Sequence, residues 1–113
     1  MTRLTFTSMS CLVVCASLTL GISAAQSSSK GDAAKGKETF EQCAVCHNVD
    51  TDEKKMGPSL KGLFKRKTLA NGKPVNDENV LAQINNGGNG MPAYNDMLSA
   101  DEKANILAYL HTL

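Results

Sequence analysis

The chain has 113 residues, a length typical of one domain, with 12 basic and 11 acidic side chains and a formal net charge of +1. A protein this close to neutral has no general electrostatic reason to bind nucleic acid or an anionic membrane, so we expect neither as a partner. Aromatic residues make up only 4% of the chain, and a domain this small buries little apolar surface by itself. A large apolar cofactor at its centre would supply part of the missing core.

Residues 1–25 have the pattern of a secretory signal peptide. Arg3 supplies a positive charge, residues 12–22 are uncharged and mostly apolar, and small residues follow from Ser23 to Ala25. This order predicts cleavage after Ala25 and export to the periplasm or an equivalent compartment outside the cytoplasm. An uncleaved membrane anchor is the alternative. It is disfavoured because a spanning helix needs about 20 mainly apolar residues and serines and threonines dilute this stretch.

The predicted cleavage changes the cysteine count. Cys11 and Cys15 lie in the leader, so the mature chain keeps only Cys43 and Cys46. A lipid on Cys15 is a minor alternative, because lipoprotein signals place a small residue before the cysteine and Val14 is not small. A disulfide between Cys43 and Cys46 would close a very short loop and constrain the unfolded chain little. The mature pair therefore needs a role other than a structural crosslink.

The mature chain begins with a polar lead-in at residues 26–31, and the domain covers residues 32–113. Asp32 is placed to cap a helix that continues past Phe40. Gly36 and Phe40 are four residues apart and so share one face of this helix. Because glycine costs about 1 kcal/mol relative to alanine inside a helix, Gly36 indicates that a second helix crosses closely there.

The middle of the chain alternates short helical segments with loops. Residues 59–67 contain a candidate helical turn, and residues 68–74 contain Asn-Gly, a strong turn signal. Asn76 or Asp77 is placed to cap another helix. Residues 85–90 read Asn-Asn-Gly-Gly-Asn-Gly, and we expect them to form a loop without helix or strand.

The last helix has the clearest pattern. Ser99 and Glu102 have the spacing of a capping box, and an apolar series that includes Ile106 follows them. No alternating strand pattern of useful length occurs in the mature chain. The sequence therefore predicts an all-α fold of three to four helices.

Residues 43–47 read Cys-Ala-Val-Cys-His, and this motif carries the chemistry. Two thiols on one turn are able to add to the two vinyl groups of a haem and form thioethers. The adjacent His47 then directs an imidazole nitrogen at the iron from the same side. The motif predicts one covalent haem c attached through Cys43 and Cys46, with His47 as an axial iron ligand.

Two other chemistries use similar residues. A thioredoxin-like pair needs a preceding strand and a βαβ frame, and neither pattern is present. A structural zinc site needs four nitrogen or sulfur ligands. The mature chain offers only Cys43, Cys46, His47 and the distant His111, and we expect His111 to interact with a helix dipole rather than with a metal.

A sixth iron ligand is predicted at Met91. It follows the glycine-rich loop and precedes Pro92, so it is held in a loop rather than on a helical face. Methionine is usually a core filler, and core packing is our interpretation of Met97, which leads into the last helix. Met56 lies only nine residues beyond His47, too close to reach the opposite side of a haem.

Pro58 is a candidate for a supporting contact. Proline lacks an N–H but keeps its carbonyl, which is able to accept a hydrogen bond from the Nδ1–H of His47 and so fix the tautomer and orientation of the ring. An ordinary turn at Gly57-Pro58 explains the same residues equally well.

Together these features resemble the class I c-type cytochromes, small single-haem proteins with His and Met iron ligands. The resemblance covers about residues 32–113. It rests on Cys43-Ala44-Val45-Cys46-His47, Gly57-Pro58-Ser59-Leu60, Asn89-Gly90-Met91-Pro92 and the pairs Gly36/Phe40 and Ile106/Tyr109. It implies a cytochrome c-like fold wrapped around one haem, with the first and last helices crossing at the glycine and an aromatic ring. It further implies the roles given above for Pro58 and Met91.

The chain departs from that family in two ways, because it has no tryptophan and its middle is short. The haem propionate contacts are therefore open. The basic residues available for them are Lys65, Arg66, Lys67 and Lys73, and a solvated basic face is the other interpretation.

An iron held by both His47 and Met91 has no open position, which favours electron transfer over catalysis. We therefore expect a soluble, monomeric electron carrier and not an enzyme. It would exchange electrons with redox protein donors and acceptors through an exposed haem edge, without strong membrane association after signal cleavage. The alternatives are a haem subunit of a larger dehydrogenase or sulfur-oxidising complex, and a ligand-binding haem sensor.

Overall fold

The computed structural model describes residues 30–113. The predicted signal peptide and residues 26–29 of the lead-in lie outside the described residues. The elements are α1 (Ala33–Ala44), the 3₁₀ turn η1 (Leu63–Lys65), α2 (Asp77–Asn86) and α3 (Ala100–Leu110). No strand longer than an isolated bridge occurs in this part of the chain, which confirms the all-α prediction. None of the helices within it combines the length and apolar content that a bilayer span needs.

Polar side chains fix where the helices begin. Asp32 accepts hydrogen bonds from the N–H groups of Ala34 and Lys35 at the start of α1. Of the two predicted caps for α2, Asn76 is the residue that acts, because its side chain accepts from the N–H of Asn79. These caps satisfy backbone donors that have no partner inside the helix.

The end of α2 corrects the prediction for residues 85–90. Asn85 and Asn86 form the last residues of the helix, and the loop begins only at Gly87. Gly87 has a φ of +61° and donates its N–H to Gln83 O. The helix continues to this point because asparagine is tolerated in a last turn, whereas the positive φ that ends the helix favours glycine.

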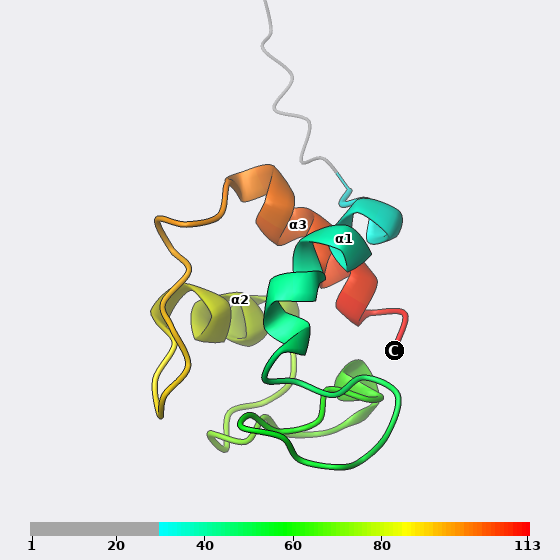
Figure 1. The fold of residues 1–113 in the computed structure, drawn as a ribbon, viewed down its shortest axis with the longest axis vertical. Helices are drawn as coiled ribbons and strands as arrows, with labels where there is room; N and C mark the ends of the chain where they lie inside the picture. The colour runs from blue at the N-terminus through cyan, green and yellow to red at the C-terminus, as the bar shows by residue number, and fades with distance from the viewer. Residues whose placement is uncertain (1–29) are drawn as a thin grey trace, which may run out of the picture.

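Helices α1 and α3 cross at one end of the domain, and α2 lies beside α3 (Figure 1). The crossing is close because Gly36 has no side chain, and a Cβ there would overlap the backbone carbonyl of Asn105. One turn further along α1, the rings of Phe40 and Tyr109 pack with their centroids 5.3 Å apart. The predicted helix crossing at Gly36 and Phe40 is therefore present.

The buried apolar residues come from every element. They are Phe40, Leu63, Val80, Leu98, Ile106 and Leu110. Leu98 replaces Met97, for which core packing was predicted. That prediction is wrong, because Met97 is 64% exposed. The segment before α3 turns Leu98 inward, with its N–H bonded to Tyr94 O, so its neighbour Met97 points outward.

The crossing predicts that Gly36→Ala destabilises the domain. Alanine is the better helix former by about 1 kcal/mol, but its Cβ would overlap backbone that cannot rotate away. We expect the free energy of unfolding to fall by about 1–3 kcal/mol, measured by urea denaturation of the haem-loaded protein. Lys37→Ala on the exposed side of α1 is the control and should change it by less than about 0.5 kcal/mol. A Gly36→Ala protein as stable as its parent would contradict the close crossing.

The capping box of α3 predicts a stability that depends on pH. Hydrogen bonds from the backbone N–H and then the hydroxyl of Ser99 lower the pKa of Glu102 from its ordinary value of 4.5. A lowered folded-state pKa contributes stability that is present above the unfolded pKa and is lost as pH falls through the folded pKa. Glu102→Gln should therefore be less stable than the parent at neutral pH, with the difference closing below about pH 4.5. Denaturation midpoints measured across this range check it, and a difference independent of pH would contradict it.

Candidate functional site

A cavity of about 570 Å³ occupies the middle of the domain. This volume lies within the range of sites that hold small molecules and cofactors. Side chains from all three α-helices, from η1 and from the intervening loops line it. Its apolar lining includes Phe40, Leu60, Leu63, Leu69, Val80, Ile84, Ile106 and Leu110. Much of the apolar core therefore forms the wall of this cavity.

The Cys-x-x-Cys-His motif lies at the end of α1 and opens onto this cavity. Cys43 is in the last turn of the helix, and its carbonyl accepts the N–H groups of Cys46 and His47, each at 3.0 Å. Both thiols are free and line the cavity. Burial, and then the neighbouring Cys46, raise the pKa of the Cys43 thiol. The two sulfurs thus stand on one turn beside an apolar space, as covalent haem attachment requires.

The ring of His47 is held from two sides. Its Nδ1 lies 2.8 Å from Pro58 O, and because a carbonyl only accepts, Nδ1 carries the proton. The other ring nitrogen, Nε2, is then the one with a free lone pair. Against the ring stands Gly57, where an added Cβ would lie 2.5 Å from His47 Cε1. The hydrogen bond between His47 and Pro58 O, for which an ordinary turn was an equal alternative from the sequence, is thus present in the structure.

Met91 lines the same cavity from the loop that follows α2. The loop is narrow, because Gly88 and Met91 exchange two backbone hydrogen bonds of 3.0 Å. Residues 87–90 all have positive φ, a conformation that favours glycine and tolerates asparagine. The amide Nε2 of Gln83 lies 3.8 Å from Met91 Sδ. The glycine-rich sequence therefore shapes a loop that presents one thioether to the apolar space.

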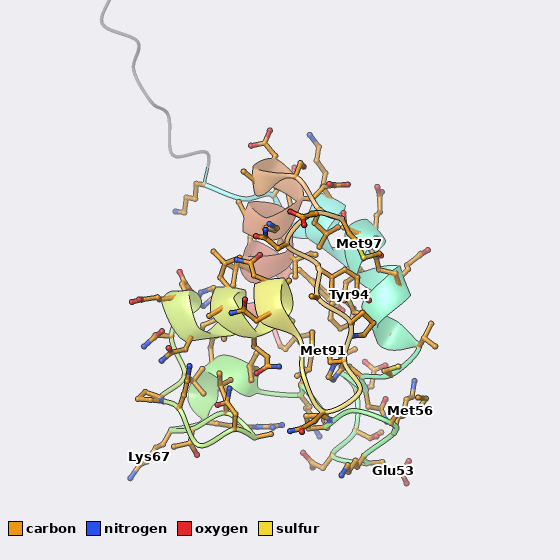
Figure 2. The ribbon with its side chains drawn as sticks, turned by 90° about the vertical axis from the view of Figure 1, so that its left-hand side faces the viewer. Glu53, Met56, Lys67, Met91, Tyr94 and Met97 are labelled. Carbon is orange, nitrogen blue, oxygen red and sulfur yellow. The ribbon has the colours of Figure 1, made fainter. Side chains whose placement is uncertain are left out.

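The competing methionines are placed differently. In Figure 2 Met97 lies above Tyr94 and Met91, and Met56 lies below them on the lower loops. Met56 is also at the cavity wall but is 83% exposed. It lies next to Gly57, on the same segment as Pro58, whose carbonyl bonds to His47. Met91 and Met56 thus both reach the cavity wall, whereas Met97 is not among the residues that line it.

Polar side chains at the cavity wall include several that sequence reasoning missed. Of the four basic residues considered for propionate contacts, Arg66 alone lines the cavity, and its Nη1 donates to Ser59 O at 2.9 Å. Lys54 and Tyr94 line it as well. Burial, followed by the nearby Cys43 and Cys46, raises the pKa of Tyr94. Of these residues, only Tyr94 could have been found from the sequence, because it lies three residues beyond Met91.

His111 lies outside the cavity lining. It is the C-cap residue of α3, at the helix end where the sequence places it. Its Nε2 is 2.6 Å from Asp77 Oδ1, and its ring stacks on Phe64 with centroids 3.6 Å apart. No group of three or more His, Cys, Asp or Glu side chains gathers as a metal site in residues 30–113. The donor set of a structural zinc site is thus not assembled there.

Comparison with known proteins gives consistent matches. Residues 31–110 match the family described as cytochrome c oxidase, cbb3-type, subunit III. The chain is 35% identical over 81 residues to cytochrome c6 of Diacronema lutheri, and the match covers 71% of this chain and 94% of that protein. It is 36% identical over 86 residues to cytochrome c oxidase subunit 2 of Alkalihalophilus pseudofirmus, which covers 70% of this chain but only 25% of that protein.

A solved structure is similar as well. Cytochrome c6 from the diatom Phaeodactylum tricornutum superposes with a TM-score of 0.57 at 30% sequence identity. The similarity covers 73% of this chain and 93% of that one.

The contact between Gly57 and His47 predicts the effect of Gly57→Ala. The added Cβ would press on the ring, so the ring must turn and its hydrogen bond to Pro58 O must lengthen. We expect unfolding free energy to fall by about 1–3 kcal/mol in chemical denaturation. Glu53→Ala, an exposed change in the same loop, should stay within about 0.5 kcal/mol of the parent. Equal stability of the two variants would show that the ring is not held in this way.

Proposed function

The chain belongs to the class I c-type cytochromes, and from this premise we propose that it is an exported electron carrier with iron ligands His47 and Met91. Membership of the family establishes a cytochrome c-like fold and a covalently bound haem c. It also establishes a role in electron transport rather than enzyme catalysis.

One observation carries the proposed ligand set. The free ring nitrogen of His47 and the thioether of Met91 belong to two loops that line one apolar cavity. The cavity also receives both thiols of the motif, which fit thioether attachment through Cys43 and Cys46. The haem supplies a one-electron iron couple, and the residues around it fix how readily that couple accepts an electron.

The side chains act in three ways. Pro58 O accepts a hydrogen bond from Nδ1 of His47, which fixes the ring so that Nε2 would be free to bind the iron. Met91 would contribute a neutral sulfur, which would not offset the charge of ferric iron and so would favour the reduced state. The apolar lining acts in the same direction, because it stabilises the additional positive charge of the oxidised site poorly. If His47 and Met91 both bound the iron, a substrate would have no place to coordinate.

Partners are proposed to dock over the motif. Val45, between the two cysteines, is 72% exposed, and Met56 at the cavity wall is 83% exposed. Lys54 and Lys55 stand beside Met56 in the chain. A small apolar surface next to basic side chains suits brief encounters with acidic redox proteins, whose interfaces are small and weak. We propose a monomer that works in this way outside the cytoplasm after removal of residues 1–25.

A second candidate function is supported by one comparison. The match to subunit 2 of a cytochrome c oxidase covers only a quarter of that protein, so a chain segment of this kind also occurs within a larger protein. The present chain would then be a haem subunit that stays bound to a larger complex. Sedimentation of the purified protein discriminates the two, because a carrier remains a monomer at all concentrations.

The ligand proposal is tested optically on protein exported by a host with a haem c maturation system. The reduced-minus-oxidised spectrum should be that of covalent haem c, and the oxidised form should have the weak long-wavelength band of an iron–methionine bond. Met91→Ala should abolish this band, and Met97→Ala is the matched control that should keep it. A band that survives in Met91→Ala would exclude Met91. Carbon monoxide binding to the reduced parent would favour a ligand sensor instead.

A further inference from the structure

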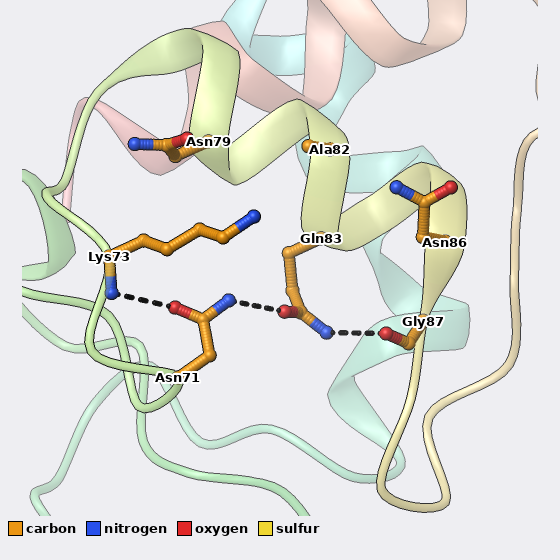
Figure 3. Close-up of a pocket in the computed structure, with 7 residues that line it drawn as sticks. All are labelled: Asn71, Lys73, Asn79, Ala82, Gln83, Asn86 and Gly87. Atoms are coloured by element: carbon orange, nitrogen blue, oxygen red, sulfur yellow. Dashed lines mark hydrogen bonds between the residues drawn. The ribbon is translucent and has the colours of Figure 1, made fainter.

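A chain of hydrogen bonds runs from the turn at residues 68–74 through Asn71 and Gln83 to Gly87 (Figure 3), and Gln83 also contacts the thioether of Met91. The backbone N–H of Lys73 donates to Asn71 Oδ1 at 3.0 Å, and Asn71 Nδ2 donates to Gln83 Oε1 at 2.9 Å. Gln83 Nε2 then donates to Gly87 O at 2.9 Å and lies 3.8 Å from Met91 Sδ. Two side-chain amides thus connect a remote turn to the loop that presents Met91.

The direction of this chain is fixed at both ends by backbone groups. A peptide N–H only donates, so the end of the Asn71 amide that faces Lys73 must be its oxygen. The NH₂ group of Asn71 therefore faces Gln83, and Gln83 accepts this hydrogen bond through its amide oxygen. At the far end Gly87 O only accepts, and this requires the NH₂ group of Gln83. Both ends demand the same orientation, with the N–H side of Gln83 toward the sulfur.

The turn is built to hold Asn71 in place. Leu69 donates its N–H to Lys73 O at 2.8 Å, and Gly72 donates to Leu69 O at 2.9 Å. Gly72 has a φ of +80°, which suits the Asn-Gly turn. Asn71 therefore lies in a short loop that is closed by backbone hydrogen bonds, and this loop holds its side chain against α2.

Asn71 and Gln83 also stand between two cavities. Both line the central cavity, and both line an outer polar pocket of about 230 Å³ that includes Lys73, Asn79 and Asn86. If the bond between them is lost, the Gln83 amide faces a polar pocket in which water competes for its oxygen. Its orientation toward Met91 then rests on the single hydrogen bond to Gly87 O.

We propose that Asn71 is a positioning residue for the Met91 thioether, acting through the amide of Gln83. The inference rests on the proposed function, in which Met91 is an iron ligand. An N–H group directed at the sulfur draws electron density from it and makes it a poorer donor to iron. Ferric iron loses more from this than ferrous iron does, so the contact raises the reduction potential. Asn71 thus acts on the potential from a turn that contributes no iron ligand.

The experiment compares the reduction potentials of haem-loaded variants. Asn71→Leu removes both side-chain hydrogen bonds of Asn71, the one from Lys73 N–H and the one to Gln83 Oε1. Asn71→Ser keeps a hydroxyl that is able to accept from Lys73 N–H and preserve the turn, but it is too short to reach Gln83. In both we expect the ratio of reduced to oxidised protein at a fixed ambient potential to fall about three- to tenfold, in the same direction as in Gln83→Leu. In the reduced protein, the side-chain amide resonances of Gln83 should shift in both Asn71 variants.

Asn79→Leu is the matched control. Asn79 lines the same outer pocket and ties the same turn to α2, since its Nδ2 donates to Pro74 O at 2.9 Å. Its loss should lower stability as the loss of Asn71 does, yet leave the potential unchanged. A double-mutant cycle completes the test, because Asn71→Leu should have no further effect on the potential in a Gln83→Leu background.

The outcomes separate this inference from the function on which it rests. If the parent lacks the iron–methionine band, the Met91 assignment fails and the inference fails with it. If the parent has the band but both Asn71 variants keep the parental potential, the inference alone is overturned. An equal shift in Asn79→Leu, or a full Asn71 effect that persists in the Gln83→Leu background, also overturns it, because the turn would then act by general loosening.

Discussion

The close approach of α1 to α3 at Gly36 sets the position of everything that follows along the chain. Backbone lies against backbone there, and Phe40 continues the contact against Tyr109 one turn later. The end of α1 is therefore held firmly, and Cys43 stands in its last turn. Phe40 belongs both to this contact and to the wall of the cavity. The motif is thus anchored to the most tightly packed part of the domain, while its thiols face the space that the domain does not fill.

Both proposed iron ligands lie in loops, and each loop is held by backbone hydrogen bonds instead of by helical packing. Gly57 donates its N–H to Cys46 O at 2.9 Å, which brings the Pro58 carbonyl beside His47. On the other side, the paired bonds between Gly88 and Met91 close the second loop. A helix presents side chains at fixed intervals along a face. A loop stabilised in this manner directs a single side chain, which is what an axial ligand needs.

Several of the features that the sequence predicted correctly depend on neighbours in the chain. The caps at Asp32 and Ser99 are examples, since each side chain bonds to an N–H two or three residues away. The error at Met97 arose where tertiary packing decides. Whether Leu98 or Met97 turns inward depends on the path of the segment before α3, and no local pattern contains it. The bond between Asn71 and Gln83 joins residues of separate elements, and only the fold brings them together.

The two proposed ligands share a form of control that does not depend on neighbouring titratable groups. Behind His47 stands a proline carbonyl, which only accepts, so the ring has one tautomer. Behind Met91 stands the Gln83 amide, whose orientation follows from the peptide groups of Lys73 and Gly87. Peptide groups neither change protonation near neutral pH nor exchange donor for acceptor. A site constrained in this way reorganises little when its charge changes by one electron, and small reorganisation is the property that a carrier in brief contact with its partners requires.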